Sequence, residues 1–204
     1  GTADGAAGAL MLNHNAKGFA TQTEFRGNEA ANGAAMWLGD NASMVVEASS
    51  VLSNKATSGA FAVRDNASLI LDGGAVDHKN LFEGNVGENG AALAINSSLP
   101  VTIKGRMEIN DNHATQNGGG VYAVLRDESN LECDPLFTAF PFLLSLESSS
   151  SLLLTNNKAD LGGGGLFADC VHPGNATSVL FQEIFKQSQQ CPNGGIGLES
   201  DDGK

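Results

Sequence analysis

Histidine and carboxylate side chains are the first candidates for chemistry in this chain. Its four histidines share no common spacing: His14, His78, His113 and His172. General acid–base catalysis needs such groups held together on one face, so this scatter does not predict a catalytic site. Asp40 and Asp65 do share a context, since each directly precedes an Asn-Ala-Ser tripeptide. The pair could bind calcium through its oxygen atoms, but exposed carboxylates are usually only solvated. We therefore expect no metal and no cofactor.

The cysteines suggest a disulfide. There are three, Cys133, Cys170 and Cys191, and no Cys-x-x-Cys pair, so zinc is not predicted. In an oxidising compartment an odd count gives one disulfide and one thiol. We favour Cys170–Cys191, which would fasten the C-terminal segment. Cys133–Cys170 is the competing pairing, and three buried, reduced cysteines are the simplest alternative.

Four glycosylation sequons are present, at Asn41, Asn66, Asn96 and Asn175. The first three precede similar apolar runs, so we expect them at the same turn of successive repeats. In a secreted glycoprotein they would carry a row of glycans along one edge. The alternative is an Asx turn that recurs with the repeat.

The composition excludes several functions. The net charge is −12, from 11 Lys plus Arg against 23 Asp plus Glu, so nucleic acid binding is not expected. No apolar run reaches the roughly 20 residues of a membrane span, and we expect no membrane insertion. Gly is frequent, at 26 residues, while aromatic residues make up only 6%. A thin core lined by small aliphatic side chains, with many turns, fits these figures.

An internal repeat predicts the fold. "FRGNEAANGAAMWL" at 25–38 returns as "FEGNVGENGAALAI" at 82–95, and eight Gly-rich phrases occur along the chain, "GGAV" at 73–76 among them. An apolar residue stands three positions before each repeated asparagine, at Phe25, Val51, Phe82, Ile109 and Leu154. The asparagines of the repeat are Asn28, Asn54, Asn85, Asn112 and Asn157. The corner glycines are Gly33, Gly59, Gly90, Gly119 and Gly163.

Short strands that repeat in this way predict a parallel β-helix, because each coil can bury its inward side chains only against a copy of itself. Equivalent residues then lie directly above one another. Glycine supplies the positive φ of a tight corner. The asparagine amides would bond to the adjacent coil as a ladder, which satisfies buried polar groups.

These phrases resemble a known family. "FRGN" and "FEGN" match the Phe-x-x-Asn motif, and the Gly-rich phrases are similar to the Gly-Gly-Ala-Ile/Leu/Val motif, of the chlamydial polymorphic outer membrane proteins (Pmp). Similar repeats occur in surface proteins of algae and other protists. The resemblance implies a right-handed parallel β-helix of the pectin-lyase-like architecture, which is either displayed at a cell surface as an adhesin or secreted as a passenger segment. We expect an all-β chain of about six or seven coils.

Two segments interrupt the pattern. Residues 126–150 exceed the usual repeat length and are predicted as an insertion loop. Its aromatic residues Phe137, Phe140 and Phe142 would form a lid over one face, a partner-binding patch or part of a disordered loop. Residues 169–204 are atypical, and 177–191 favour a short helix slightly over two strands. We expect residues 1–204 to be a single β-helix segment, itself part of a longer solenoid.

The predicted function follows from the fold. We expect an extracellular or cell-surface, non-enzymatic protein that presents loops and assembles in a larger surface or filamentous protein. Its partners would be segments of the same assembly or a host or cell-surface partner, with glycans as a further candidate. The alternative is a carbohydrate-active enzyme of the same fold, namely a polysaccharide lyase, hydrolase or epimerase.

Overall fold

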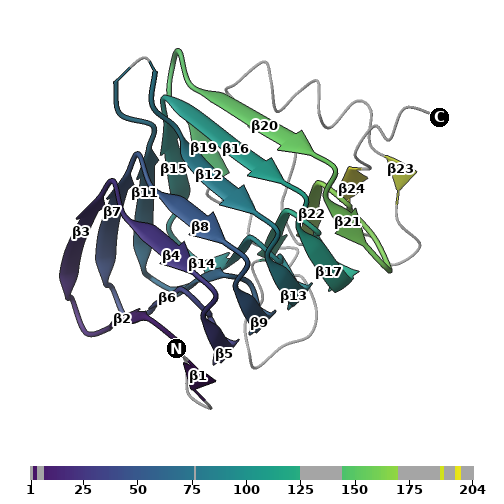
Figure 1. The fold of residues 1–204 in the computed structure, drawn as a ribbon, viewed down its shortest axis with the longest axis horizontal. Helices are drawn as coiled ribbons and strands as arrows, with labels where there is room; N and C mark the ends of the chain where they lie inside the picture. The colour runs from purple at the N-terminus through teal and green to yellow at the C-terminus, as the bar shows by residue number, and fades with distance from the viewer. Residues whose placement is uncertain are drawn as a thin grey trace, which may run out of the picture.

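The chain winds into a stack of parallel β-coils (Figure 1). The structure is a computed structural model, and it describes residues 2–3, 7–75, 77–124, 144–169, 189–190 and 196–198. These residues form strands and turns and contain no helix. The predicted all-β parallel β-helix is confirmed.

Each coil gives one strand to each of four sheets, in the chain order B, C, D and A. Sheet B holds β2 (Leu10–Leu12), β6 (Met36–Leu38), β10 (Phe61–Asp65), β14 (Leu93–Ser97), β18 (Val121–Val124) and β22 (Leu166–Asp169). Sheet C holds β3 (Lys17–Thr21), β7 (Ser43–Glu47), β11 (Ser68–Asp72), β15 (Val101–Lys104) and β19 (Leu144–Leu146).

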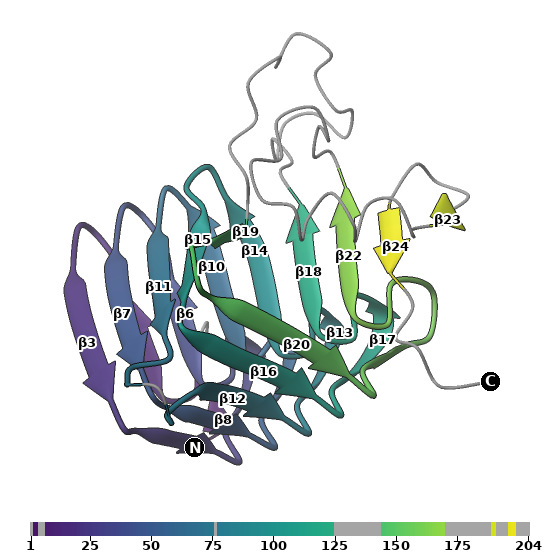
Figure 2. The ribbon, with the colours of Figure 1, turned by 90° about the horizontal axis from the view of Figure 1, so that it is seen from above.

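Sheets D and A complete the coil. Sheet D holds β4 (Glu24–Arg26), β8 (Ser50–Leu52), β12 (Asn80–Glu83), β16 (Arg106–Asn110) and β20 (Ser151–Thr155). Sheet A holds β1 (Thr2–Ala3), β5 (Glu29–Asn32), β9 (Lys55–Ser58), β13 (Val86–Asn89), β17 (His113–Asn117) and β21 (Lys158–Ala159). Figure 2 shows the coils side by side along one axis, from β3 to β20.

The stack is shorter than predicted. Four successive coils follow one another, β2–β5, β6–β9, β10–β13 and β14–β17, whereas the fifth contains residues 125–143, which lie outside the described part. The prediction of six or seven coils was too high because it counted every Gly-rich phrase as the same corner. Gly73 and Gly74 lie between β11 of sheet C and β12 of sheet D, so they do not begin a coil.

The C-terminal part departs from parallel stacking. The strand β24 (Ile196–Leu198) pairs antiparallel with β22, and β23 (Gln189–Gln190) pairs antiparallel with β24. The slight preference for a helix over 177–191 was wrong at Gln189–Gln190, which form a strand; the rest of that segment lies outside the described residues. The insertion predicted at 126–150 was also too long, because β19 pairs in register with β15, Leu144 opposite Val101.

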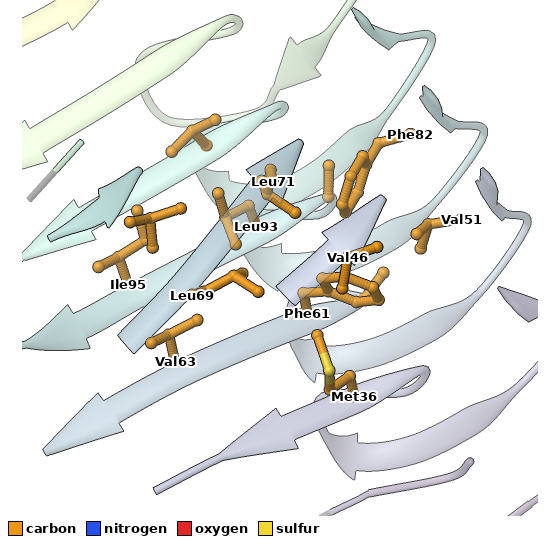
Figure 3. Close-up of a cluster of buried hydrophobic side chains, with 14 of the residues drawn as sticks. Met36, Val46, Val51, Phe61, Val63, Leu69, Leu71, Phe82, Leu93 and Ile95 are labelled. Carbon is orange, nitrogen blue, oxygen red and sulfur yellow. The ribbon is translucent and has the colours of Figure 1, made fainter. Parts of the chain in front are cut away.

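The core is a narrow column of aligned side chains (Figure 3). Strand residues alternate between the core and the outer face, as in β7, where Met44 and Val46 are buried. Phe61 of sheet B lies between two phenylalanines of sheet D. Its ring packs edge-to-face against Phe25 at a centroid distance of 5.5 Å and against Phe82 at 4.9 Å. Phe61 and Phe82 belong to the coil β10–β13 and Phe25 belongs to the coil β2–β5, so one aromatic side chain links two coils that are not adjacent in the chain.

Truncation of Phe61 should therefore destabilise the stack strongly. Phe61 is fully buried, and Phe61→Ala removes both aromatic contacts and leaves a cavity, so we expect a loss of about 3–5 kcal/mol in the free energy of unfolding. Urea denaturation followed by circular dichroism measures this. Phe19→Ala is the matched control, since Phe19 is 62% exposed, and an equal loss in the two variants would contradict the packing described here.

Candidate functional site

Five buried asparagines form a continuous ladder at the corner between sheets D and A. In the first four, Nδ2 donates a hydrogen bond to Oδ1 of the equivalent asparagine in the next coil. The donor–acceptor distances from Asn28 through Asn54, Asn85 and Asn112 to Asn157 are 2.9, 3.0, 2.8 and 2.9 Å. The structure therefore places all five predicted asparagines in a single row.

The same amides also bind the backbone of neighbouring coils. Oδ1 of Asn85 accepts a hydrogen bond from the backbone N–H of Asn54 at 2.9 Å, and its Nδ2 donates to the carbonyl of Val51 at 2.9 Å. Asn54 and Asn112 form the equivalent two bonds with the backbone of the preceding coil. Each accepts from the N–H of the preceding ladder asparagine and donates to the carbonyl of Phe25 or Phe82, respectively. Because these side chains are almost completely buried, each bond satisfies a group that would otherwise be costly to bury.

A left-handed residue precedes each asparagine of the ladder. The φ angles are positive at Gly27, Ser53, Gly84, Asp111 and Asn156, between 53° and 64°. Only two of these are glycine, although non-glycine residues rarely adopt this conformation. The corner geometry is thus retained in every coil, and the bonds of the following asparagine offset the backbone strain.

Glycine is required at the next corner, between sheets A and B. Positive φ angles occur at Gly33, Gly59, Gly90, Gly118 and Gly163. A Cβ at Gly33 would lie 2.2 Å from the Met36 carbonyl oxygen, and one at Gly90 would lie 2.4 Å from that of Leu93. The structure corrects one residue, since the left-handed position is Gly118 rather than Gly119. Gly119 follows it and has a non-left-handed backbone, although a Cβ there would also clash with the Lys158 carbonyl.

A second polar row, which the sequence analysis missed, lies between sheets C and D. The backbone N–H of Thr23 donates to Ser49 Oγ at 3.0 Å, and that of Ser49 donates to Asn80 Oδ1 at 2.9 Å. Asn80 is completely buried. Each residue stands two positions before the apolar residue of the repeat, at Phe25, Val51 and Phe82. That constant offset is the signal that could have identified the row.

The sequons are only partly aligned. Asn41 and Asn66 occupy equivalent positions before β7 and β11, whose strands pair Ser43 with Ser68, and both asparagines are exposed. Asn96 lies within β14 opposite Arg64 of β10, so it is two residues out of phase. The equivalent of Asn66 in that coil is Ser98, whose Oγ donates to Asn66 Oδ1. The expectation of three stacked sequons was therefore wrong for Asn96.

The histidines and aspartates form pairs rather than a cluster. His14 Nδ1 lies 2.9 Å from an Asp40 carboxylate oxygen, and His113 Nε2 lies 3.0 Å from Asp160. The hydrogen bond to His113 lowers the pKa of Asp160 below its ordinary value. In the part of the chain that the structure describes, no group of three His, Cys, Asp or Glu side chains could hold a metal ion.

Glu108 is the one buried carboxylate in the described core. Its side chain is only 7% exposed, and it forms ion pairs with Lys79 and Arg106. The hydrogen bond from Lys79 is the main reason why the pKa of Glu108 lies below its ordinary value, while burial acts in the opposite direction. This triad neutralises one buried charge on sheet D.

Several predicted site residues lie outside the described residues. These are Cys133, Cys170 and Cys191, Phe137, Phe140 and Phe142, and Asn175 and His172. The disulfide Cys170–Cys191, the partner loop and the fourth sequon therefore stay predictions.

Comparisons of the chain with models of protein families, with curated proteins and with solved structures return no match. The similarity to the Pmp repeats therefore remains an expectation from the motifs. Within the described residues, no helix is long and apolar enough to cross a membrane. The fold and the two ladders define the class of protein, a parallel β-solenoid with polar rows at its corners.

Replacement of the central ladder asparagine should weaken the whole stack. Asn85→Leu preserves the approximate side-chain shape but leaves the backbone N–H of Asn54 without its acceptor, and it removes one hydrogen bond each from Asn54 Nδ2 and the Val51 carbonyl. Each unsatisfied buried group costs about 1–3 kcal/mol, so we expect a loss of at least about 3 kcal/mol in the free energy of unfolding. Chemical denaturation measures it.

Asn41→Gly is the control for this experiment. Asn41 is exposed and has a φ of 62°, a conformation that glycine adopts easily. The free energy of unfolding of this variant should therefore remain within about 0.5 kcal/mol of the wild-type value. A small effect of Asn85→Leu, similar to that of the control, would show that the ladder does not stabilise the coils.

The Glu108 triad should make stability depend on pH in the acid range. Because the folded pKa is depressed, the carboxylate stabilises the fold above its unfolded pKa of about 4.3. This contribution is lost as the pH falls through the folded pKa. Between about pH 6 and about pH 3, urea midpoints should fall less for Glu108→Gln than for the wild type. Glu83→Gln, at an exposed carboxylate, should follow the wild type; identical profiles for all three proteins would refute the role of Glu108.

Proposed function

We propose that the chain is an extracellular structural and adhesive β-helix, which presents loops and assembles within a larger cell-surface or filamentous protein. The observation that supports this proposal is the unbroken asparagine ladder from Asn28 to Asn157. It runs along the stacking axis, parallel to the hydrogen bonds of all four sheets. A rod held by aligned bonds in every coil is suited to holding other groups at a fixed spacing.

The surface supports partners other than nucleic acid. With a net charge of −12, the rod would repel phosphate backbones. Its partners in this proposal are segments of the same assembly or a cell-surface partner. The aligned, exposed Asn41 and Asn66 offer one edge for glycans, and the segment between β18 and β19, residues 125–143, would supply further contacts.

The alternative, a carbohydrate-active enzyme, has one observation in its favour. His113, Asp160 and Lys158 meet on sheet A, with Lys158 Nζ 3.8 Å and His113 Nε2 3.0 Å from the same Asp160 oxygen. A histidine hydrogen-bonded to a carboxylate is a recurrent acid–base arrangement. This group is about half exposed, and its three members also suit a surface ion pair.

A paired adhesion and turnover assay tests the two functions. Beads coated with the full chain should stay attached to cultured cells under flow more often than beads coated with Asn85→Leu, which presents a destabilised rod. Acidic and neutral polysaccharides incubated with the same protein should release no reducing ends and no unsaturated products. Product release that is abolished by His113→Gln would overturn the structural proposal, and so would equal retention of the two bead types.

A further inference from the structure

An apolar row lies on the outward face of sheet C, in the coils β2–β5, β6–β9 and β10–β13. Phe19, Val45 and Ile70 are register neighbours on β3, β7 and β11, which lie side by side in Figure 2. Strand residues alternate between the two faces, so these three side chains point away from the core. Phe19 is the one aromatic residue among the exposed large hydrophobic side chains of the described residues. In the next coils the row continues as Thr102 and Ser145, so its apolar part ends at Ile70.

Two carboxylates border this apolar row on the side of sheet D. Glu47 and Asp72 follow Val45 and Ile70 by two residues, so they belong to the same outward face, and they are register neighbours. Both lie beside Gly74. Asp72 Oδ1 accepts a hydrogen bond from the Gly74 N–H at 2.8 Å, and a Cβ at Gly74 would lie 3.4 Å from Glu47 Oε1. Like charges opposite one another destabilise a sheet, so this pair has a cost.

No cation of the described residues compensates that pair. Each ion pair in this part of the chain joins other partners. Lys104 is the register neighbour of Asp72, but its Nζ lies 3.0 Å from a Glu147 carboxylate oxygen. Lys17 belongs to the opposite border of the face, in register with Ser43. A partner with positive charge would therefore relieve the repulsion between the two carboxylates.

The spacing of the two rows fits an α-helix laid along the stacking axis. Successive coils are about 4.8 Å apart, and neighbouring side chains on one helix face recur every 5–6 Å or so. The apolar and acidic rows are two strand residues apart, roughly 7 Å. A helix can span that offset, because its diameter with side chains is about 10 Å. One amphipathic helix can thus contact both rows at once.

Charge decides between the candidate occupants of this face. A second copy of the chain would bring another Glu47 and Asp72 to the contact, together with a net charge of −12, and like charges oppose such pairing. A membrane that contains anionic lipid is repelled for the same reason. A helix with one apolar row and one basic row complements both rows of sheet C.

We propose that the outward face of sheet C binds a basic amphipathic helix of a partner protein. Apolar side chains of the helix would pack on Phe19, Val45 and Ile70, and its lysines or arginines would pair with Glu47 and Asp72. The apolar row is only about 10 Å long, so this contact suits a weak and reversible association. The surface is independent of the structural and adhesive role proposed above.

Fluorescence anisotropy with a defined probe tests this surface. The probe is a fluorescein-labelled peptide of two heptads, with leucine at the a and d positions and lysine at the e and g positions. It is titrated with the full chain at low ionic strength. The controls are a peptide of the same composition in scrambled order and one with glutamate in place of lysine. We expect saturable binding of the lysine helix that weakens as salt is added, and much weaker binding of both controls.

Apolar variants separate a defined surface from general charge attraction. Phe19→Ala should weaken binding about tenfold, as expected for the loss of one large apolar contact. Ile70→Thr should weaken it also, and it introduces the residue type that Thr102 already supplies at the same position of the next coil. Leu161→Ala is the matched control, since Leu161 is 74% exposed and follows β21 of sheet A. Its affinity should equal that of the wild type.

Charge variants test the acidic row. Glu47→Gln should lower the affinity by up to about fivefold and should make it less dependent on salt. Asp72→Asn should act in the same direction, and it preserves an oxygen for the Gly74 N–H. Glu83→Gln, at an exposed carboxylate of sheet D, should change neither the affinity nor its salt dependence.

Four results would overturn the proposal. The first is the absence of saturable binding of the lysine helix, and the second is wild-type affinity in both Phe19→Ala and Ile70→Thr. The third is self-association of the wild type in sedimentation that Phe19→Ala abolishes, which would assign this face to a second copy. The fourth is binding to phosphatidylcholine vesicles that Phe19→Ala abolishes, which would assign the face to a membrane.

Discussion

The fold depends on one constraint: the amide of a corner asparagine can be buried only if the next coil supplies the same amide in register. Asn54 donates to Asn85 and receives from Asn28, so its side chain is satisfied only by the neighbouring coils. A slip by one residue would leave a column of buried donors and acceptors without partners, each of them costly. This requirement fixes the register of sheets D and A, and the backbone bonds of the other sheets follow from it.

Core positions and corner positions differ in how many residue types they accept while the register is kept. Core positions tolerate changes of shape, since Phe25, Val51 and Phe82 occupy the same column and Phe61 fills the space that the smaller valine leaves. Corners tolerate little. Gly33 and Gly90 recur because a carbonyl oxygen stands where a Cβ would be. At the ladder corner, in contrast, Ser53 and Asp111 adopt the left-handed conformation, because the following asparagine binds two coils and offsets the strain.

The outer faces are free to vary, and they carry the features that differ between coils. Sheet D bears the buried Glu108 triad in a single coil pair, and sheet A bears the His113–Asp160 contact. Sheet B places two small residues, Ala62 and Ala94, in a row between Trp37 and Tyr122. A solenoid separates the two tasks in this way: repeated inward positions hold the stack together, while single outward positions determine what the surface can contact.

The sequence by itself determined the coil, the asparagine row and most of the glycine corner, because these features recur with one spacing and recurrence is visible in a single chain. It could not determine the coil count, since the Gly73–Gly74 phrase looks the same as a corner between sheets A and B but lies between β11 and β12. It misplaced Asn96 by two residues for a similar reason, because this sequon begins inside β14, opposite Arg64, whereas Asn41 and Asn66 follow the ends of β6 and β10. Only the tertiary structure placed Phe19, Val45 and Ile70 in one outward row beside Glu47 and Asp72, since the winding of the coils decides which distant residues become neighbours.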